Sequence, residues 1–143
     1  MITTGGGFST YFPQPSWQQA AVKSYFAKQQ NSAPGYNRYG RGYPDISLIG
    51  TYYLTAIQQQ LYLLSGTSCS APLLAAFVTL TNSVRKKAGL PSIGFLNPTL
   101  YSSNPSPVFV DVTSGNNNCC VFTGGNYNAA TCCSAGFTSQ PGL

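Results

Sequence analysis

The stretch Ser65-Gly66-Thr67-Ser68-Cys69-Ser70-Ala71-Pro72 lies between two apolar runs, Leu61 to Leu64 and Leu73 to Val78. This order predicts a corner at which a buried strand ends and a buried helix begins. The glycine allows a tight turn, and hydroxyl groups at a helix N-terminus lie beside unpaired N–H groups and partial positive charge. A serine is well placed there to act as a nucleophile. The commoner role of Ser68 or Ser70 at such a corner is to cap the helix.

Charged residues are scarce in this chain of 143 residues, whose length suits one modest domain. Only 6% are charged, and the net charge of +5 reflects a shortage of acids, Asp45 and Asp111 alone, more than a basic patch. The seven Lys and Arg form no stripe, so nucleic-acid binding is not expected. No apolar run reaches the length of a membrane span, and residues 1 to 20 lack the features of a signal peptide. We therefore expect no membrane partner, and any export signal would lie upstream.

The cysteines indicate an exported protein. Cys119-Cys120 and Cys132-Cys133 are two adjacent pairs that flank a loop of Gly, Asn and Thr. They predict a disulfide staple with three possible connectivities. A zinc site is a weaker alternative, because adjacent pairs lack the usual two-residue gap between ligands and the chain has no His. Cys69 remains, and we expect it to be a small buried thiol.

Periodicity and capping patterns predict two main helices. Ser16 and Gln19 form a capping-box pattern that opens a helix running to about Lys28. The second helix runs over about 70–87, has a basic last turn against its negative end, and is terminated by Gly89. The buried side of the first helix is expected to contain Trp17, Ala20, Ala21, Tyr25 and Val22.

The other elements are expected to be short. We expect a structured glycine loop at 5–7 and a surface loop over 29–42, both before the strands. A short helical segment is expected around Leu100. The tail from Thr113 shows little periodicity. A polar turn at 58–60 joins the second and third strands. The candidate strands are 46–49, 51–55, 61–64 and 108–112.

The absence of His limits the chemistry that these residues can perform. It excludes a Ser-His-Asp triad within the chain. A carboxylate can replace His as the base in an acidic medium, where its pKa is close to the working pH. Nothing in the sequence pairs Asp45 with Asp111, so we expect that the chain cannot assemble an acid/base relay alone.

Five blocks of this sequence, in order and with matching spacing, resemble the sedolisins, the serine-carboxyl peptidases that include tripeptidyl peptidases. The central block, Ser65 to Pro72, resembles the family signature Ser-Gly-Thr-Ser-x-Ser-x-Pro. The other four blocks are Gly5–Ser9 with Tyr11–Pro13, Gly40–Asp45, Gly94–Pro98 with Leu100-Tyr101, and Asp111–Gly115. The resemblance implies an α/β subtilisin-like three-layer fold with a parallel sheet, of which residues 1–143 would be the C-terminal part of a single peptidase domain.

The resemblance also implies a role for Ser68. It matches the family's nucleophile, which attacks the scissile carbonyl to form an acyl-enzyme that water hydrolyses. The family's Glu base, its assisting Asp and the Asp of the oxyanion site all lie N-terminal to the block that Gly5–Gly7 matches, so none is present here. The implied partners are a peptide or protein substrate and the N-terminal part of the same domain, and Asp45 is expected to belong to the scaffold.

A calcium site is implied near the C-terminus. Asp111 matches the family's first carboxylate ligand and Val112 a ligand that acts through its carbonyl, as suits a cation that prefers oxygen. Gln140 and Gly142 match later carbonyl positions, with Gln140 in place of a Gly. Leu143 stands where Trp is usual, and the chain ends one residue before the expected second carboxylate. The site would therefore be incomplete in this chain.

These observations predict a serine peptidase of an acidic compartment, secreted or lysosomal, that acts as a tripeptidyl-peptidase or an endopeptidase. This chain alone is expected to be inactive. The main alternative is a non-enzymatic secreted module or pseudo-peptidase stapled by its cysteines. A subtilisin-type peptidase, which would require a catalytic His upstream, is a weaker third possibility.

Overall fold

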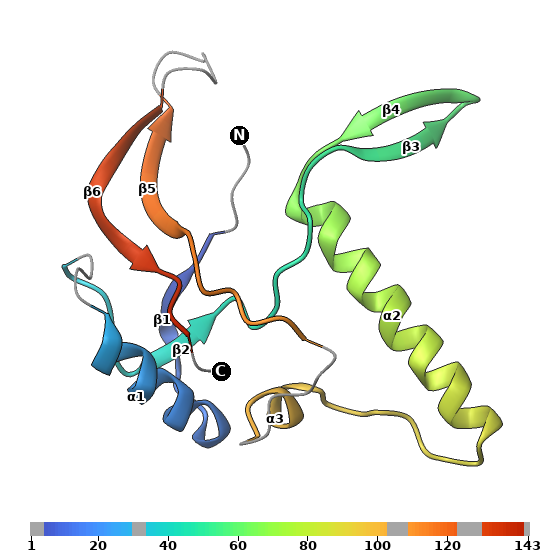
Figure 1. The fold of residues 1–143 in the computed structure, drawn as a ribbon, viewed down its shortest axis with the longest axis horizontal. Coiled ribbons are helices and arrows are strands. Elements are labelled where there is room, and N and C mark those ends of the chain that lie inside the picture. The colour runs from blue at the N-terminus through green and yellow to red at the C-terminus, as the bar shows by residue number, and fades with distance from the viewer. Residues whose placement is uncertain (1–4, 30–33, 103–108, 123–129, 142–143) are drawn as a thin grey trace. The chain divides into compact units, whose positions relative to one another are not determined.

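The computed structural model describes residues 5–29, 34–102, 109–122 and 130–141, and over 118–122 and 130–134 it describes the backbone alone. The chain divides into two compact units (Figure 1). One contains the described residues of 5–45 and 97–143, and the other contains residues 46–96. Each unit is described by itself below.

The first unit combines two antiparallel strand pairs with short helices. Strand β1 pairs with β2, and β5 pairs with β6, each pair forming a two-stranded sheet. Its elements are β1 (Gly7–Pro13), the 3-10 helix η1 (Ser16–Gln18), α1 (Gln19–Lys28), β2 (Gly40–Tyr43), α3 (Asn97–Leu100), β5 (Asn116–Phe122) and β6 (Ala130–Thr138). The helical segment predicted around Leu100 is therefore confirmed as α3.

Helix α1 ends at Lys28 as predicted, but it begins differently. A single 3-10 turn, η1, opens the helical segment at Ser16, and neither η1 nor α1 has a side-chain cap hydrogen bond, so the predicted capping box is wrong. Gln19 already has helical backbone angles, and its N–H bonds the carbonyl of Ser16, so the backbone of this turn satisfies itself. On the predicted buried side Val22 is buried, whereas Ala20 is exposed.

Half-buried aromatic side chains of the first unit pack against one another. The ring of Phe8 on β1 lies 4.9 Å from that of Phe26 on α1 and 5.4 Å from that of Phe137 on β6. The ring of Tyr36, in the loop before β2, lies 5.0 Å from that of Phe137. Such centroid separations are those of favourable aromatic pairs. These contacts join segments that are far apart in the sequence. The predictions of a glycine loop at 5–7 and a surface loop over 29–42 did not include them.

The second unit contains the β3–β4 hairpin and the long helix α2 (Thr67–Lys87). Strand β3 (Tyr53–Ile57) pairs with β4 (Gln60–Leu64) in antiparallel register. Gln58 and Gln59 have φ angles of 50° and 64°, as in the two-residue turns that suit the twist of a hairpin. The two strands and polar turn predicted from the sequence are confirmed, with boundaries shifted by about two residues.

Helix α2 ends as the sequence predicts. Gly89 has a φ of 72°, its N–H bonds the carbonyl of Lys86, and the N–H of Leu90 bonds the carbonyl of Arg85. This pattern is a Schellman motif, in which a glycine takes the left-handed conformation that other residues disfavour. The basic residues of 85–87 lie in the last turn, where they oppose the negative end of the helix dipole.

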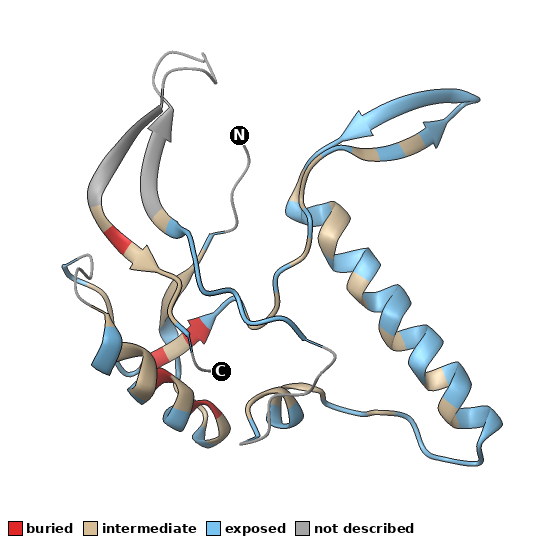
Figure 2. Ribbon diagram, viewed as in Figure 1, coloured by how far each residue is buried: buried red, intermediate tan, exposed pale blue. Residues whose placement is uncertain are grey.

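The corner between β4 and α2 is confirmed, but the burial that the apolar runs predict for both elements is not found in this chain, as expected if the neighbours that would cover them lie in another part of the protein. Every residue of β4 is exposed and no residue of α2 is buried (Figure 2). The apolar side chains are present as expected. In the part of the chain that the structure describes, no element covers them.

Two predicted strands, 46–49 and 108–112, are not formed in the described residues, and residue 108 lies outside them. Residues 46–49 and 109–112 are not in strands, although both are rich in β-branched or aromatic residues. A strand needs a hydrogen-bonding neighbour, and the carbonyl of Ile49 instead accepts hydrogen bonds from the hydroxyls of Ser70 and Tyr53. In contrast, the tail thought to lack periodicity forms the β5–β6 hairpin.

The observed sheets are smaller than the predicted one. All three strand pairs in the described residues are antiparallel, so the chain contains helices and sheets as expected but its described part holds no parallel pair. No helix in the same described ranges combines the length and apolar character needed to cross a membrane.

Candidate functional site

Ser68 is the second residue of α2, directly after the turn that leaves β4. The residue before the helix is Gly66, with φ 155° and ψ 153°, a conformation that is essentially restricted to glycine. Gly66 occupies the N-cap position and no side chain caps the helix, so the alternative in which Ser68 or Ser70 is the N-cap is wrong. The stretch that looked like a cap is instead a glycine turn that leads into the first turn of a helix.

The hydroxyl of Ser68 is accessible. Ser68 is exposed, and among the described residues its hydroxyl makes no hydrogen bond, whereas the half-buried Ser70 donates one to the carbonyl of Ile49 at 2.8 Å. Ser68 is therefore the serine of this turn whose oxygen is free to meet a ligand. It also lies within the first turn of a 21-residue helix, where the partial positive charge of the helix dipole favours a developing negative charge.

No base lies in the same unit as Ser68. Residues 46–96 contain no Asp, Glu or His, so that unit has no side chain of the types that usually accept a proton from serine. Both acids, Asp45 and Asp111, belong to the other unit.

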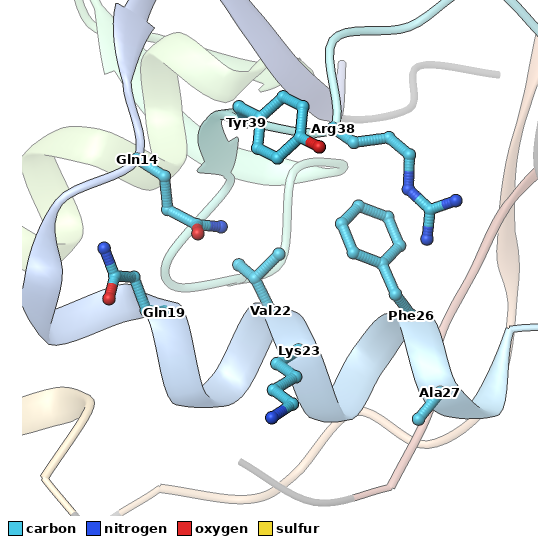
Figure 3. A pocket seen from close by; sticks show the side chains of 8 residues that line it. All are labelled: Gln14, Gln19, Val22, Lys23, Phe26, Ala27, Arg38 and Tyr39. Atoms are coloured by element: carbon cyan, nitrogen blue, oxygen red, sulfur yellow. The ribbon is translucent and has the colours of Figure 1, made fainter.

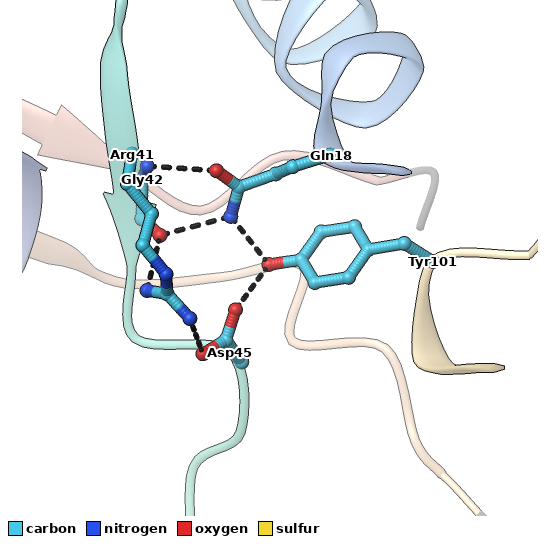
Figure 4. Close-up of polar contacts among 5 residues, drawn as sticks. All are labelled: Gln18, Arg41, Gly42, Asp45 and Tyr101. Carbon is cyan, nitrogen blue, oxygen red and sulfur yellow. Dashed lines mark hydrogen bonds and ion pairs between the residues drawn. The ribbon is translucent and has the colours of Figure 1, made fainter. Parts of the chain in front are cut away.

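Asp45 is held in a polar network of the first unit (Figure 4). One of its carboxylate oxygens forms a 2.6 Å ion pair with Arg41, and the other accepts a 2.8 Å hydrogen bond from the Tyr101 hydroxyl. The Tyr101 oxygen in turn accepts a 2.9 Å bond from the Gln18 amide, which also exchanges two hydrogen bonds with the backbone of Gly42. Every polar partner of Asp45 here is part of the packing between β2, η1 and the end of α3, which agrees with a scaffold role.

Burial changes the chemistry of Tyr101 in this network. Desolvation, with a contribution from the neighbouring Asp45 carboxylate, raises the pKa of Tyr101 to about 12, while the hydrogen bond from Gln18 acts in the opposite direction. Gln18 is only 1% exposed, and its amide has partners on both its oxygen and its nitrogen. Tyr101 belongs to one of the blocks that resemble the sedolisins, but no sequence pattern predicts its contact with Gln18, because a Gln at the start of a helix is ordinarily a surface residue.

Of the four residues implied for a calcium site, the structure describes Asp111, Val112 and Gln140, and only Asp111 carries a carboxylate. Asp111 and Val112 are exposed, Gln140 donates a 3.1 Å side-chain hydrogen bond to the Thr138 hydroxyl, and Gly142 lies outside the described residues. The described ranges contain no group of three or more His, Cys, Asp or Glu residues that could hold a metal ion. Calcium takes six to eight oxygen ligands, so one carboxylate with a few carbonyls does not complete a site.

Of the five cysteines, the structure describes the side chain of Cys69 alone. Cys69 has a free thiol, as expected for the unpaired cysteine, but it is half-buried and not buried as predicted. The side chains of Cys119, Cys120, Cys132 and Cys133 lie outside the described part of the structure. Their backbones lie in β5 and β6, where Cys120 and Cys132 occupy paired positions in the strand register.

A pocket of about 480 Å³ lies on the first unit, between α1 and the segment before β2 (Figure 3). The Arg38 guanidinium lies 4.7 Å from the centre of the Phe26 ring at this pocket, a cation–π contact. None of the site residues predicted from the sequence lines it, and its eight lining residues include no carboxylate and no hydroxyl nucleophile other than a tyrosine. They are Gln14, Gln19, Val22, Lys23, Phe26, Ala27, Arg38 and Tyr39.

Comparison with known proteins identifies relatives over most of the chain. The chain is 42% identical over 124 residues to physarolisin of Physarum polycephalum. It is 38% identical over 121 residues to tripeptidyl-peptidase 1 of Canis lupus familiaris, and 40% identical over 118 residues to tripeptidyl-peptidase SED2 of Arthroderma otae. These matches cover 83%, 82% and 82% of this chain but only 21%, 21% and 20% of the relatives. No family model matches the chain.

The chain thus spans about a fifth of the length of these relatives. Identities near 40% over more than 115 residues cannot be explained by the short motif around Ser68 alone, so the resemblance extends through both units. The resemblance stated from the sequence blocks is confirmed: the chain is a homologue of the sedolisin peptidases, of the tripeptidyl-peptidase 1 type.

Proposed function

We propose that the chain is the nucleophile-bearing C-terminal part of a sedolisin peptidase domain with a subtilisin-like fold, and that Ser68 is its nucleophile. The observation that carries this proposal is the exposed Ser68 hydroxyl at the start of α2, directly after the glycine-only turn at Gly66. Homology to proteins named as peptidases supports it. The three sheets of the described chain would be extended by strands from the rest of that domain.

The proposed chemistry begins with proton transfer from Ser68. A carboxylate from the rest of the domain takes the proton of the hydroxyl, and the serine oxygen forms a bond to the scissile carbonyl carbon. The tetrahedral intermediate collapses, the peptide C–N bond breaks as the amine leaves with a proton, and an acyl-enzyme remains. Water then releases the acid and restores the hydroxyl. The N-terminus of α2 contributes favourable electrostatics to the developing negative charge.

The rest of the peptidase domain is the partner that the second unit requires. On α2, Phe77, Leu80 and Val84 are 53%, 65% and 68% exposed, although a folded domain normally buries such side chains. On the hairpin, Leu54 and Leu61 are 67% and 69% exposed. Phe77, Leu80 and Val84 recur at helical spacing, and an exposed apolar face of a helix marks an interaction site. We propose that the remaining layers of the same domain cover it, and that this chain alone is inactive.

Three further properties belong to the same proposal. The complete domain binds one calcium ion, to which Asp111 and the carbonyls of Val112, Gln140 and Gly142 contribute part of the ligand set. The protein is secreted or lysosomal and works in an acidic medium. A carboxylate base fits the acidic medium, and the two adjacent Cys-Cys pairs fit an oxidising compartment. Its substrate is a peptide or protein, cleaved as a tripeptidyl-peptidase or as an endopeptidase.

The test uses the complete protein that contains this chain. Ser68→Ala should abolish peptide hydrolysis at acidic pH while leaving the unfolding temperature nearly unchanged, because the exposed hydroxyl has no hydrogen-bond partner in the described residues. Ser65→Ala serves as the matched control in the same turn, because Ser65 accepts a 3.2 Å bond from the backbone N–H of Tyr52 and is not the proposed nucleophile. Full activity of the Ser68→Ala variant would overturn the assignment. An inactive wild-type protein would favour the pseudo-peptidase alternative.

A further inference from the structure

We propose that Ser70 is a positioning residue for the peptidase reaction: its hydrogen bond to Ile49 fixes the orientation of the first turn of α2 and so aims the Ser68 hydroxyl. This inference rests on the proposed function, because it concerns the geometry of the proposed nucleophile. It rests on contacts that all lie within the second unit.

Ser70 anchors the helix to the segment that precedes β3. Its hydroxyl donates a 2.8 Å hydrogen bond to the carbonyl of Ile49, which also accepts a bond from the Tyr53 hydroxyl. A carbonyl oxygen has two lone pairs, so both are used. The next carbonyl, that of Gly50, accepts a 2.7 Å bond from the N–H of Gly66. The carbonyls of Ile49 and Gly50 therefore bond the first turn of α2 and the preceding turn at Gly66, respectively.

The helical rotation connects Ser70 to Ser68. Successive residues of an α-helix are rotated by about 100°, so side chains two positions apart point about 200° apart. Ser70 is half-buried and bonded to the anchoring segment, while Ser68 is exposed. A bond that fixes Ser70 on one side of the helix consequently fixes the direction of Ser68 on the opposite side.

The first turn of α2 also lacks two of the constraints that normally hold a helix start. Gly66 provides no side-chain cap, and Pro72, which lies inside the helix, has no N–H to donate to the carbonyl of Ser68 four residues earlier. The backbone around Ser68 is therefore held less firmly by the helix itself than an ordinary first turn. The bond from Ser70 to Ile49 is an external constraint at the position where the internal ones are missing.

The bonding of Ser70 distinguishes a positioning role from a nucleophilic one. Its proton is committed to the Ile49 carbonyl, which cannot act as a general base at ordinary pH, so the Ser70 oxygen is not activated there. Ser70 also lines a pocket of about 210 Å³ together with Ile46, Leu48 and Leu74. Space of that size accommodates one additional methyl group beside the hydroxyl.

The experiment compares three variants of the complete protein in peptide hydrolysis at acidic pH. Ser70→Ala should lower kcat by about 10- to 100-fold with KM within about twofold, because a misaligned nucleophile slows chemistry without removing a substrate contact. Ser70→Thr keeps the hydroxyl and should restore kcat to within about threefold of wild type. Thr79→Val is the matched control, because it deletes a hydroxyl bonded to the Ala75 carbonyl on the same helix, and its kcat should equal that of wild type.

Each outcome decides one question. Wild-type kcat in Ser70→Ala, or no recovery in Ser70→Thr, would overturn the positioning role while leaving the proposed function intact. Equal losses in Ser70→Ala and Thr79→Val would show a general effect of weakening α2 and would likewise overturn it. An active Ser68→Ala variant together with an inactive Ser70→Ala variant would instead overturn the proposed function, since it would make Ser70 the nucleophile.

Discussion

Gly66 shows how one residue determines where the proposed nucleophile stands. Its φ of 155° and ψ of 153° lie in a region that only glycine occupies without strain. A Cβ there would lie 3.8 Å from the nearest atom, the backbone nitrogen of Ser68, so space is not the limitation. The glycine in the signature is required by its backbone conformation, and the helix begins directly after it.

Gly66→Ala should therefore lower the free energy of unfolding of the complete protein by about 1–3 kcal/mol through backbone strain alone. Denaturant unfolding measures this change. Gly50→Ala, in the segment before β3 whose carbonyl bonds the N–H of Gly66, is the control, because a Cβ at Gly50 would make an ordinary 3.7 Å contact with the Ser70 hydroxyl and its φ is not in the left-handed region. Equal stabilities of the Gly66→Ala and Gly50→Ala variants would contradict the strain argument.

Tyr101 gives a prediction about pH at the same scale. Its pKa is raised to about 12 in the folded protein, chiefly by burial, against about 10 in an unfolded chain. The folded state thus holds the phenolic proton more tightly, so the stabilisation is fully present below pH 10 and is lost as pH rises from about 10 to 12. Tyr101→Phe should be less stable at neutral pH but should lose less stability over that range. Parallel pH dependences of the two proteins in denaturant unfolding would refute this link.

Elements that depend on local sequence are easier to predict than elements that form through distant contacts. The β3–β4 hairpin and α2 were predictable because local features determine them: a polar turn between apolar strands, and Gly89 after a basic last turn. Strand β2 was not, because it forms against the distant β1 and its Gly40 is placed by a close approach. A Cβ at Gly40 would lie 1.9 Å from the Ser9 carbonyl oxygen. Long-range contacts of this kind leave no periodic pattern in a four-residue strand.

The β5–β6 hairpin narrows the disulfide prediction. Its register pairs Cys120 with Cys132, and directly opposed residues of antiparallel strands have Cα separations within the range that a disulfide spans. We predict that these two cysteines are linked in the complete protein, which leaves Cys119 and Cys133 to pair with each other or with a cysteine elsewhere in that protein. Such a link around a short loop contributes about 3 kcal/mol to stability.

Partial reduction, alkylation and tandem mass spectrometry of the non-reduced protein would assign the connectivity. Cys69 provides an internal control, because its free thiol should be alkylated before any reduction. Cross-linking of Cys120 to Cys133, a bond between the neighbours Cys119 and Cys120, or four free thiols would each contradict the register-based pairing.

For the molecule as a whole, the sequence revealed the catalytic candidate but not its surroundings. Ser68 could be identified because the signature around it is local and continuous. The burial of α2 was predicted from its composition, and composition alone cannot say which part of a protein covers a helix. A central helix of a layered fold and an exposed apolar helix have the same sequence pattern, and they differ only in what packs against them.

The exposed state of α2 predicts how the isolated chain behaves. In a chain of these 143 residues alone, amides within residues 73–84 should exchange with solvent nearly as fast as in an unfolded peptide, because no residue of α2 is buried. In the complete protein the same amides should be protected on the order of 1,000-fold or more, as expected for a stably folded core. Hydrogen exchange with mass spectrometry makes the comparison. Equal protection in both proteins would show that α2 needs no partner.

Ser68 should carry the acyl group during turnover. Acid-quenching the complete protein during turnover of a peptide substrate, followed by proteolysis and mass spectrometry, locates the acyl group directly. We predict an added acyl mass on the peptide that contains residues 65–72, with fragmentation that places it on Ser68, and no such mass in Ser68→Ala. An acyl group on Ser65, on Ser70 or on a residue outside this stretch would contradict the account.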